Sequence, residues 1–452
     1  MNFVNFANIH TFTAGFRTVY HKGEIFINYN ILFMKKIISL FLAATAFACT
    51  QEQSVDVTVT NPSAIDRSKE VTEISMDAIA KLNGESFIIS DNNGTQVPYQ
   101  ITYDKKIIFP VDVNANSSVT YKIKPGTPEA FATVACGKFY PERVDDIAWE
   151  NDRIAFRTYG PALQATGEQA FGYDIWTKCV SEPVVDMRYK TELNPESRAK
   201  IAELRKTDKK AAQELANSIS YHIDHGNGLD YYKVGPTLGA GTSALLSNDS
   251  IVYPYCYKDY EILDNGPLRF TVKLVYNPLK VKENDNIIET RILSLDAGSQ
   301  LNKITLTFAN LNEATPLVTG IVLHEPSTDY QADAANGYIA YADPEDPTNG
   351  QIYIGAVFPE KLSDAKAVNF SDAEKKQRGA DGHVLAYATY APGNEYTYYT
   401  GAGWSKWGFK NSAEWFKYIQ DFAQKVKQPL QVLSLIHILL CFPGPTNPMR
   451  EK

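Results

Sequence analysis

One strand-like segment after another, with turn signals between them, is the feature that most constrains the fold of this chain. Near the N-terminus, "VDVTVT" at residues 55–60 alternates apolar and polar side chains, and Asn93-Gly94 is a hairpin signal. Longer segments with strand character follow, among them "DRIAFRTYG", "LRFTVKLVY", "IIETRILSL", "LNKITLTFAN", "QIYIGAVF" and "HVLAYATYA". Because strands follow strands with little helical alternation, we predict a mainly β, antiparallel protein.

The strand-like segments fall into two groups. Residues 55–125 carry short strands and turns, which predict a small N-terminal β-sandwich. "KPGTPEAF", residues 124–131, has the composition of a linker. The longer strands of residues 132–432 predict a large antiparallel sandwich of two sheets, because many strands over about 300 residues suit that architecture.

Two helical patterns interrupt the strands. Residues 194–219 are strongly charged and are predicted to be a helical insertion on the surface. Its apolar side chains form one narrow stripe: Ile201, Leu204, Ala211, Leu215 and Ile219. Residues 411–427 start with Asn411 and Glu414, which resemble a capping box. Helical spacing of Trp415, Ile419, Phe422 and Val426 predicts that this C-terminal helix packs on the larger domain.

Both ends of the chain look unlike a folded domain. "MKKIISLFLAATAFAC", residues 34–49, combines a basic start, an apolar run and small residues before Cys49, as in a lipoprotein signal peptide. We predict lipidation of Cys49; a cleaved signal with an incidental cysteine is the alternative. Residues 1–33 are interpreted as misassigned upstream translation, and residues 433–452 as a sequencing artefact, with a real apolar tail as the alternative.

These signals predict an exported protein, a periplasmic or outer-membrane lipoprotein that meets the membrane only through its lipid anchor. The net charge of −8 and the pI of about 5.5 argue against a nucleic-acid partner, which would require a basic patch. Aromatic residues make up 12% of the chain, including 27 Tyr, and suit both strand packing and sugar-binding surfaces. Cys136, Cys179 and Cys256 permit at most one internal disulfide, and their spacing matches no metal motif.

"YHIDHGNGLDYY", residues 221–232, concentrates the rare histidines of the chain. In an extended strand, Tyr221 and His225 would lie on one side and His222 on the other. Histidine titrates near neutral pH, an adjacent aspartate can orient it, and tyrosine can act as acid or base beside a cation. The predicted catalytic residues are Tyr221, His222, Asp224, His225, Asp230 and Tyr231.

Three interpretations of this segment stay open. It can be a hydrogen-bonded turn in which the histidines satisfy backbone groups. It can be a metal site made of His222, Asp224 and His225, although the spacing is not a recognised zinc pattern. It can also be a sugar-binding or catalytic rim, which we favour. No cofactor and no metal site are predicted, and a divalent cation is left open.

Other polar and aromatic clusters could complete a site for an acidic sugar. Arg157 lies in an alternating strand and is expected to face a cleft, where Arg157 and Lys178 would neutralise a substrate carboxylate. Trp176 would stack on a sugar ring. The predicted substrate-binding residues are Arg157, Asp174, Trp176, Lys178, Lys233, His324, His383 and Trp404. The sequence has no GxSxG, HExxH, P-loop or Rossmann pattern, which disfavours serine hydrolase, zinc protease and nucleotide chemistry.

Four motifs give the chain a family resemblance: "PERVDDIAWENDRIAFRTYGPAL", "FGYDIWTK", "YHIDHGNGLDYYKVGPTLGAG" and "ETRILSLDAGSQLNKI". Over roughly residues 55–432 the chain resembles a family of secreted bacterial proteins, a domain of unknown function grouped with the galactose-mutarotase-like β-supersandwich proteins. The resemblance implies a supersandwich fold and a place in polysaccharide-utilisation systems, often for pectin and other uronic-acid glycans. It carries over no catalytic residue.

The sequence therefore predicts a carbohydrate-active protein whose ligand is a plant-type oligosaccharide containing uronic acid. A lyase or epimerase would use a Tyr or His to take the proton next to a neutralised carboxylate. A glycoside hydrolase would instead use two carboxylates, for which Asp224 and Asp230 are the candidates. The alternative is a non-catalytic glycan-binding lipoprotein. We favour the lyase or epimerase slightly, because histidine and tyrosine dominate the motif.

Overall fold

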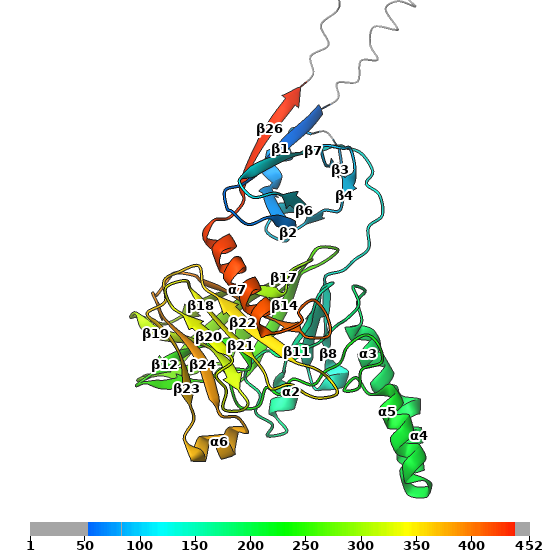
Figure 1. The fold of residues 1–452 in the computed structure, drawn as a ribbon, viewed down its shortest axis with the longest axis vertical. Coiled ribbons are helices and arrows are strands. Elements are labelled where there is room, and N and C mark those ends of the chain that lie inside the picture. The colour runs from blue at the N-terminus through cyan, green and yellow to red at the C-terminus, as the bar shows by residue number, and fades with distance from the viewer. Residues whose placement is uncertain (1–52, 83, 439–452) are drawn as a thin grey trace, which may run out of the picture. The chain divides into compact units, whose positions relative to one another are not determined.

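A computed structural model describes residues 53–82 and 84–438 (Figure 1). The strands are β1 (Gln53–Asn61), β2 (Arg67–Ser75), β3 (Phe87–Ser90), β4 (Gln96–Val97), β5 (Gln100–Ile101), β6 (Lys106–Val113), β7 (Ser117–Pro125), β8 (Cys136–Tyr140), β9 (Asp146–Glu150), β10 (Ala155–Thr158), β11 (Asp174–Trp176), β12 (Ala240–Ser247), β13 (Ser250–Val252), β14 (Tyr257–Asn265), β15 (Arg269–Tyr276), β16 (Leu279–Val281), β17 (Asn284–Asp296), β18 (Leu301–Ala309), β19 (Thr315–Leu323), β20 (Tyr330–Asp333), β21 (Tyr338–Ala342), β22 (Ile352–Val357), β23 (Asp364–Asn369), β24 (Gly382–Tyr390), β25 (Tyr396–Trp404) and β26 (Gln431–Ile438). The α-helices are α2 (Pro161–Gln164), α3 (Val185–Glu192), α4 (Pro195–Thr207), α5 (Lys209–Ile219), α6 (Asp372–Arg378) and α7 (Ser412–Lys427), and the short 3-10 helices are η1 (Met76–Ile79) and η2 (Pro141–Arg143).

The first part of the described chain is a small sandwich of two sheets, ordered β26-β1-β7-β3-β4 and β2-β6-β5. Along β1, Val55, Val57 and Val59 are fully buried while the residues between them are not, which is the period of two that a half-buried strand requires. Gly94 has a φ of 81° in the turn between β3 and β4, a conformation that glycine adopts without strain. This turn confirms the hairpin predicted at Asn93-Gly94.

The larger domain is built on two antiparallel sheets that pack face to face. The nine-stranded sheet runs β14-β15-β17-β18-β25-β22-β21-β20, with β16 beside β17, and the five-stranded sheet runs β13-β12-β19-β24-β23. One hydrophobic core contains Val272 and Ile304 from the first sheet and Ile321 and Val384 from the second. The mainly β, antiparallel class predicted from the sequence is confirmed.

A four-stranded sheet, β11-β10-β9-β8, carries the polar residues of the candidate site. The hairpin between β9 and β10 is held by Asn151, whose Oδ1 accepts hydrogen bonds from the backbone N–H groups of Arg153 and Ile154 at 2.9 and 3.1 Å. After β11, the chain passes through α3, α4 and α5 before it returns beside β11 at Asp230. Residues far apart in the sequence are thereby brought to one sheet edge.

The predicted helix over residues 194–219 is wrong in its continuity, because the structure has two helices there. Asp208 is extended, with φ −143° and ψ 90°, and its Oδ1 accepts from the N–H groups of Lys210 and Ala211 at 3.1 and 3.0 Å. An aspartate that caps a new helix stops the preceding one. α4 and α5 lie side by side and project away from the sheets (Figure 1).

The predicted C-terminal helix is confirmed as α7. Asn411 caps it by accepting from the N–H of Glu414 at 3.0 Å, and Trp415 and Ile419 are fully buried against the nine-stranded sheet. Trp415 Nε1 also donates to the carbonyl of Ile354 at 3.0 Å. No described helix is both long and apolar enough to cross a membrane.

The predictions for the chain ends concern mainly residues outside the described part. Residues 1–33, the signal segment 34–49 and Cys49 all lie there. β26 crosses the predicted boundary at residue 433 and lies beside β1 at the edge of the small sandwich, and the interpretation of residues 433–452 stays a prediction. The three described cysteines, Cys136, Cys179 and Cys256, are free thiols.

Candidate functional site

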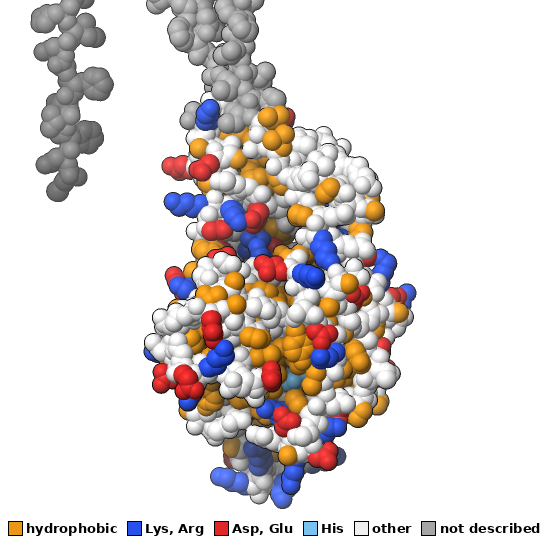
Figure 2. Space-filling model, turned by 90° about the vertical axis from the view of Figure 1, so that its left-hand side faces the viewer, with side chains coloured by type: hydrophobic (Ala, Val, Ile, Leu, Met, Phe, Trp, Pro, Cys, Tyr) orange, Lys and Arg blue, Asp and Glu red, His pale blue; other side chains and the backbone are white. Residues whose placement is uncertain are grey.

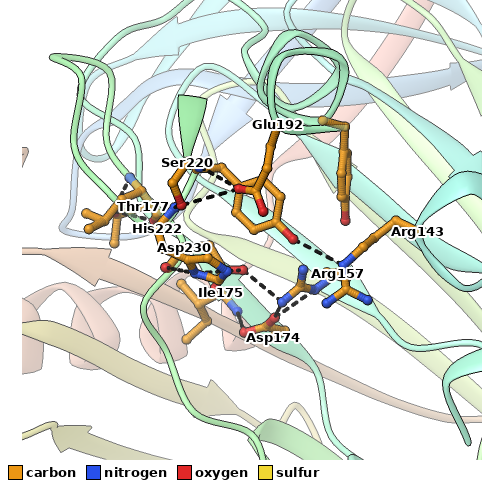
Figure 3. Close-up of polar contacts among 12 residues, drawn as sticks. Arg143, Arg157, Asp174, Ile175, Thr177, Glu192, Ser220, His222 and Asp230 are labelled. Atoms are coloured by element: carbon orange, nitrogen blue, oxygen red, sulfur yellow. Dashed lines mark hydrogen bonds and ion pairs between the residues drawn. The ribbon is translucent and has the colours of Figure 1, made fainter. Parts of the chain in front are cut away.

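A buried arginine on β10 is the centre of the candidate site (Figure 3). Arg157 is only 3% exposed, and strand pairing sets it directly opposite Asp174 on β11. Its Nε donates to Asp174 Oδ2 at 2.8 Å, and its Nη1 lies 3.6 Å from Oδ2 of Asp146 at the start of β9. The two strands that flank β10 thus bring two carboxylates to one guanidinium.

A third carboxylate, from Asp230, comes from the segment that follows helices α3, α4 and α5. Asp230 pairs with Trp176 as an isolated antiparallel bridge, and its Oδ2 accepts from Arg157 Nη2 at 2.9 Å. Tyr159 adds a hydroxyl that donates to Asp174 Oδ2 at 2.7 Å. We call this group, Asp146, Arg157, Tyr159, Asp174 and Asp230, the Arg157 cluster.

Burial controls the protonation of two carboxyl groups in the Arg157 cluster. It raises the pKa of Asp230 to about 7 and the pKa of Asp146 to about 6; Arg157 opposes the rise and Asp174 adds to it. Three carboxylates around one guanidinium leave an excess of negative charge. At least one carboxyl of the cluster can therefore exchange a proton near neutral pH, which is common at functional sites.

His222 is the exposed member of this region. Its Nδ1 lies 2.8 Å from the backbone oxygen of Asp230 and 3.8 Å from Oδ2 of the same residue, while 53% of its side chain is exposed. A carbonyl oxygen can only accept, so the proton must sit on Nδ1. In the neutral ring, Nε2 then carries a lone pair, and among the described residues it has no hydrogen-bond partner.

Tyr221 and Arg143 lie next to His222. The Tyr221 ring stacks on Trp176 at 4.7 Å and tilts against the His222 ring at 4.5 Å. Arg143 Nε donates to Tyr221 OH at 3.1 Å. Burial is the main cause that raises the pKa of Tyr221, so its phenol stays protonated. An exposed imidazole, a partly exposed guanidinium and, between them, the phenol of Tyr221, which is only 4% exposed, thus lie next to the Arg157 cluster.

The segment that carries these residues is a turn, which corrects the expected extended strand over residues 221–225. Asp224 Oδ1 accepts from the N–H groups of Gly226 and Gly228 at 2.9 and 3.0 Å. Gly228 has a φ of 95°, and a Cβ there would lie 2.2 Å from the carbonyl oxygen of Thr177. Local hydrogen bonds and this close approach override the alternating pattern.

Several predicted catalytic residues do not join the Arg157 cluster. Oδ1 of Asp224 accepts hydrogen bonds within its own turn, and Oδ2 lies 4.0 Å from Nζ of Lys406, so neither oxygen contacts a member of the Arg157 cluster. His225 is exposed and places Nε2 3.0 Å from the backbone oxygen of Ser220. Tyr231 donates to the carbonyl of Gly350 at 3.3 Å. Of the six, only Tyr221, His222 and Asp230 come together.

The predicted role of Arg157 needs correction. Its charge is already matched by Asp146, Asp174 and Asp230, and it is buried, so it does not face a cleft where it could bind a substrate carboxylate. Asp174 is equally buried and serves the same cluster. The predicted exposure of Arg157 is wrong because an alternating pattern shows on which face of a strand a side chain lies, but not which other residues cover that face.

Trp176, Lys178 and Trp404 were predicted to contact substrate, and their burial contradicts this. Trp176 is fully buried beneath Tyr221, with the Arg157 guanidinium 5.1 Å from its ring. Lys178 donates to Glu150 Oε2 at 2.6 Å in a buried ion pair, and Trp404 is 1% exposed. Each side chain finds a partner inside the protein that only the fold brings near.

The other predicted substrate-binding residues lie apart from the Arg157 cluster. His383 is 1% exposed, accepts from the N–H of Leu238 at 3.1 Å, and has a pKa lowered to about 3 by burial, which contradicts a ligand role. His324 sits between Asp343 Oδ1 and the carbonyl oxygen of Lys233, both at 2.6 Å from its ring nitrogens. The side chain of Lys233 is exposed.

Sequence reasoning missed four members of the site: Arg143, Asp146, Tyr159 and Tyr189. Tyr189 donates to Asp146 Oδ2 at 2.9 Å from α3, a helix that was not predicted. Arg143 and Asp146 belong to the segment "PERVDD", in which four of six residues are charged. That concentration of charge is the sequence feature that could have indicated them. No group of three His, Cys, Asp or Glu residues that could hold a metal ion occurs among residues 53–82 and 84–438.

Comparison with known proteins places the chain in a family. The uncharacterized protein P7 of Formosa agariphila is 28% identical over 433 residues, which cover 88% of this chain and 99% of that protein. A glycosyl hydrolase family 38 protein and an alpha-mannosidase, both from Enterococcus faecalis, share 9% and 8% identity with TM-scores of 0.41 and 0.40 over 85% of this chain. The chain spans about half of these two structures, 49% and 47% of their lengths. Residues 59–432 match the domain of unknown function DUF4861, and the chain belongs to this family.

Proposed function

We propose that the protein is a carbohydrate lyase that acts on an oligosaccharide containing uronic acid. The observation that carries the proposal is the setting of His222: Nδ1 is held by Asp230, and Nε2 is unpaired among the described residues on a ring that is half exposed. This arrangement presents a base at the surface, and the Asp230 carboxylate 3.8 Å behind it stabilises the imidazolium that forms when the base takes a proton.

Arg143, and not the buried Arg157, is the guanidinium that can reach a substrate carboxylate. Only its Nε is occupied, by Tyr221, and within the described chain its two terminal amino groups have neither a hydrogen bond nor an ion pair. A guanidinium with two free donors can hold a carboxylate through two parallel hydrogen bonds. Neutralising the carboxylate of a uronate makes the adjacent carbon-bound proton easier to remove.

The proposed reaction is a β-elimination. His222 Nε2 takes the proton from the carbon next to the carboxylate, and the electron pair of that C–H bond forms the new double bond. The bond between the next ring carbon and the glycosidic oxygen breaks, and Tyr221 gives its proton to this oxygen. A phenol whose pKa is raised by burial keeps its proton until the leaving oxygen accepts it.

Two finer assignments belong to the same proposal. The paired antiparallel sheets of the larger domain support a galactose-mutarotase-like supersandwich. The pattern of residues 34–49 supports export and a lipid anchor at Cys49 in the periplasm or outer membrane.

The test is to incubate the full chain with neutral and uronic-acid oligosaccharides and to follow the ultraviolet absorbance of an unsaturated uronate. We expect new absorbance with uronic-acid substrates only. His222→Gln should lower the rate by about 100-fold or more, the usual contribution of a general base. His225→Gln is the matched control, because it changes an exposed histidine that is bound only to Ser220, and it should keep full activity.

Other outcomes assign other functions. Saturated products would mean hydrolysis and would exclude elimination, with the raised pKa of Asp230 or Asp146 marking the acid. Sugar binding without any product would favour the non-catalytic glycan-binding lipoprotein. Equal loss of activity in His222→Gln and His225→Gln would contradict the role given to His222.

A further inference from the structure

A cavity of about 480 Å³ lies between β2 of the small sandwich, α7 and the nine-stranded sheet. It uses the sheet face opposite the main core, because Ser294 lines it while the adjacent Leu293 and Leu295 are fully buried in that core. Figure 2 shows blue and red side chains close together on the face where the small sandwich meets the larger domain. The volume lies in the range of ligand pockets.

The carboxylates that line this cavity already have partners. Each of the four is within ion-pair distance of a cation: Glu70 with Arg67, Glu73 with Lys106 and Arg269, Asp296 with Arg269, and Asp421 with Lys417. The two arginines that line the cavity are used in these pairs. The negative charge of the cavity wall is therefore compensated within the protein.

Three lysines of the same wall make no direct ion pair, although Lys303 lies within electrostatic range of Glu73, and Lys425 of Glu70 and Asp421. Lys69, Lys303 and Lys425 line the cavity, and none of their ammonium groups makes an ion pair or hydrogen bond with a described residue. Lys69 lies in a β-bulge of β2, where pairing with β6 shifts register between Arg67 and Glu70, and has a φ of 49°. A strained lysine at a bulge beside a cavity is a feature of functional sites. In a chain of net charge −8, the residues that line this cavity include five cations and four carboxylates, so the wall carries a small excess of positive charge.

The cavity also offers aromatic and hydroxyl groups. Tyr399 and Phe422 line it and contact each other with ring centroids 5.2 Å apart, and Tyr418 lies beside Phe422 at 6.1 Å. The hydroxyls of Thr72 and Ser294 also line it and have no hydrogen-bond partner within the described chain. Aromatic rings pack on the apolar face of a sugar ring, and hydroxyls and ammonium groups bind its polar edge.

We propose that this cavity is a second binding site, which takes a small sugar acid through its carboxylate and the face of its ring. Lys69, Lys303 and Lys425 bind the carboxylate, and the aromatic side chains contact the ring. The site is separate from the Arg157 cluster, and its occupancy does not depend on turnover there.

The experiment is calorimetric titration of the full chain with galacturonate at low ionic strength. We expect binding that weakens as salt is added, and D-galactose, which lacks the carboxylate, should bind about tenfold more weakly or not at all. Replacing Lys69, Lys303 and Lys425 together with Gln should weaken galacturonate binding about tenfold or more. If that variant does not fold, Lys303→Gln alone, at an exposed position, should still weaken it measurably.

A matched triple variant controls for net charge. Replacing Lys206, Lys209 and Lys210 with Gln changes the same total charge at exposed positions of α4 and α5 and should leave the affinity unchanged. The titration is repeated in an Arg143→Gln background, which removes the guanidinium proposed to hold a substrate carboxylate beside Tyr221. The cavity should still bind galacturonate in that background, and loss of all binding there would assign the signal to the proposed active site and overturn the proposal. Unaltered affinity in the cavity variant, equal binding of galactose, or no binding at millimolar galacturonate would overturn it as well.

Discussion

Two buried arginines on strands, Arg157 and Arg291, show how similar charge pairing can serve different ends. Arg291 is fully buried, and its Nε donates to Glu289 Oε1 at 2.5 Å, two residues away on the same strand. Its other nitrogens donate to Tyr173 OH at 3.0 Å and to the carbonyl of Ser243 at 3.2 Å. One cation, one carboxylate and neutral acceptors leave no net charge inside the sandwich.

The Arg157 cluster has a different balance. Its single guanidinium is shared by three carboxylates from different parts of the chain, and an exposed histidine lies 3.8 Å from one of them. Asp146 Oδ1 and Arg157 Nη1 are buried without a hydrogen-bond partner, but so is Glu289 Oε2 in the Arg291 pair, so it is the charge balance and not an unpartnered atom that separates the two regions. The comparison teaches that burial alone does not mark a site, whereas excess charge beside an exposed base does.

The largest expected effect concerns the balanced pair. Arg291→Met leaves Glu289 charged and unpaired in the core, so it should lower the free energy of unfolding by about 3–5 kcal/mol. Combining it with Glu289→Leu should recover most of that loss, because two apolar residues replace two compensated charges. Urea unfolding followed by circular dichroism measures both variants. A double variant as unstable as the single one would show that the pair does more than compensate its own charge.

The next largest effect is expected for Tyr221→Phe, beside the Arg157 cluster. The ring keeps its stacking on Trp176, but the phenolic proton is lost, so turnover should fall by about 100-fold. Stability should change by only about 1 kcal/mol, since one hydrogen bond from Arg143 is removed. Rates from unsaturated-uronate absorbance and thermal unfolding would separate the two quantities. A drop in stability without a drop in rate would make Tyr221 structural.

The pH dependence of stability should differ between the two arginine regions. Burial raises the pKa of Asp230 to about 7, above its value in the unfolded chain, so the folded state binds the extra proton between about pH 4 and 7. The free energy of unfolding should therefore fall as pH rises through this window, by at most about 1.4 kcal/mol per pH unit for one proton. Asp230→Asn should flatten this slope. An unchanged slope in urea titrations between pH 4 and 7 would contradict the assignment.

The smallest expected effect comes from His324. It lies beside one carboxylate, Asp343, as Arg291 lies beside Glu289. Burial alone would lower its pKa, but hydrogen bonding to Asp343 and the charge of that carboxylate raise it. Both ring nitrogens face oxygen atoms, so this setting favours the doubly protonated ring. This stability is present below about pH 6.5 and is lost as pH rises through the folded pKa. His324→Gln should cost about 1 kcal/mol at pH 6 and less at pH 9; an equal cost at both would contradict it.

Sequence reasoning reached the right region of the chain but not every role in it. Tyr221, His222, Asp230 and Asp174 do meet at Arg157, because scarce titratable residues in one segment are a usable signal. It misplaced Lys178 and Trp404, whose residue types occur both at sugar sites and in cores. The partner of Lys178 is Glu150, which also accepts from the N–H groups of Val184 and Val185 at the start of α3, and no local pattern announces that contact.

The sequence by itself determined the mainly β class, the hairpin at Asn93-Gly94 and the helix that ends the larger domain. These features depend on local periodicity and turn chemistry, which neighbouring residues specify. Only the tertiary structure decided which side chains are covered, that three carboxylates share Arg157, and that Arg143 keeps free donors. Burial, charge balance and pKa depend on residues distant in sequence, because they follow from what the folded chain packs around each group.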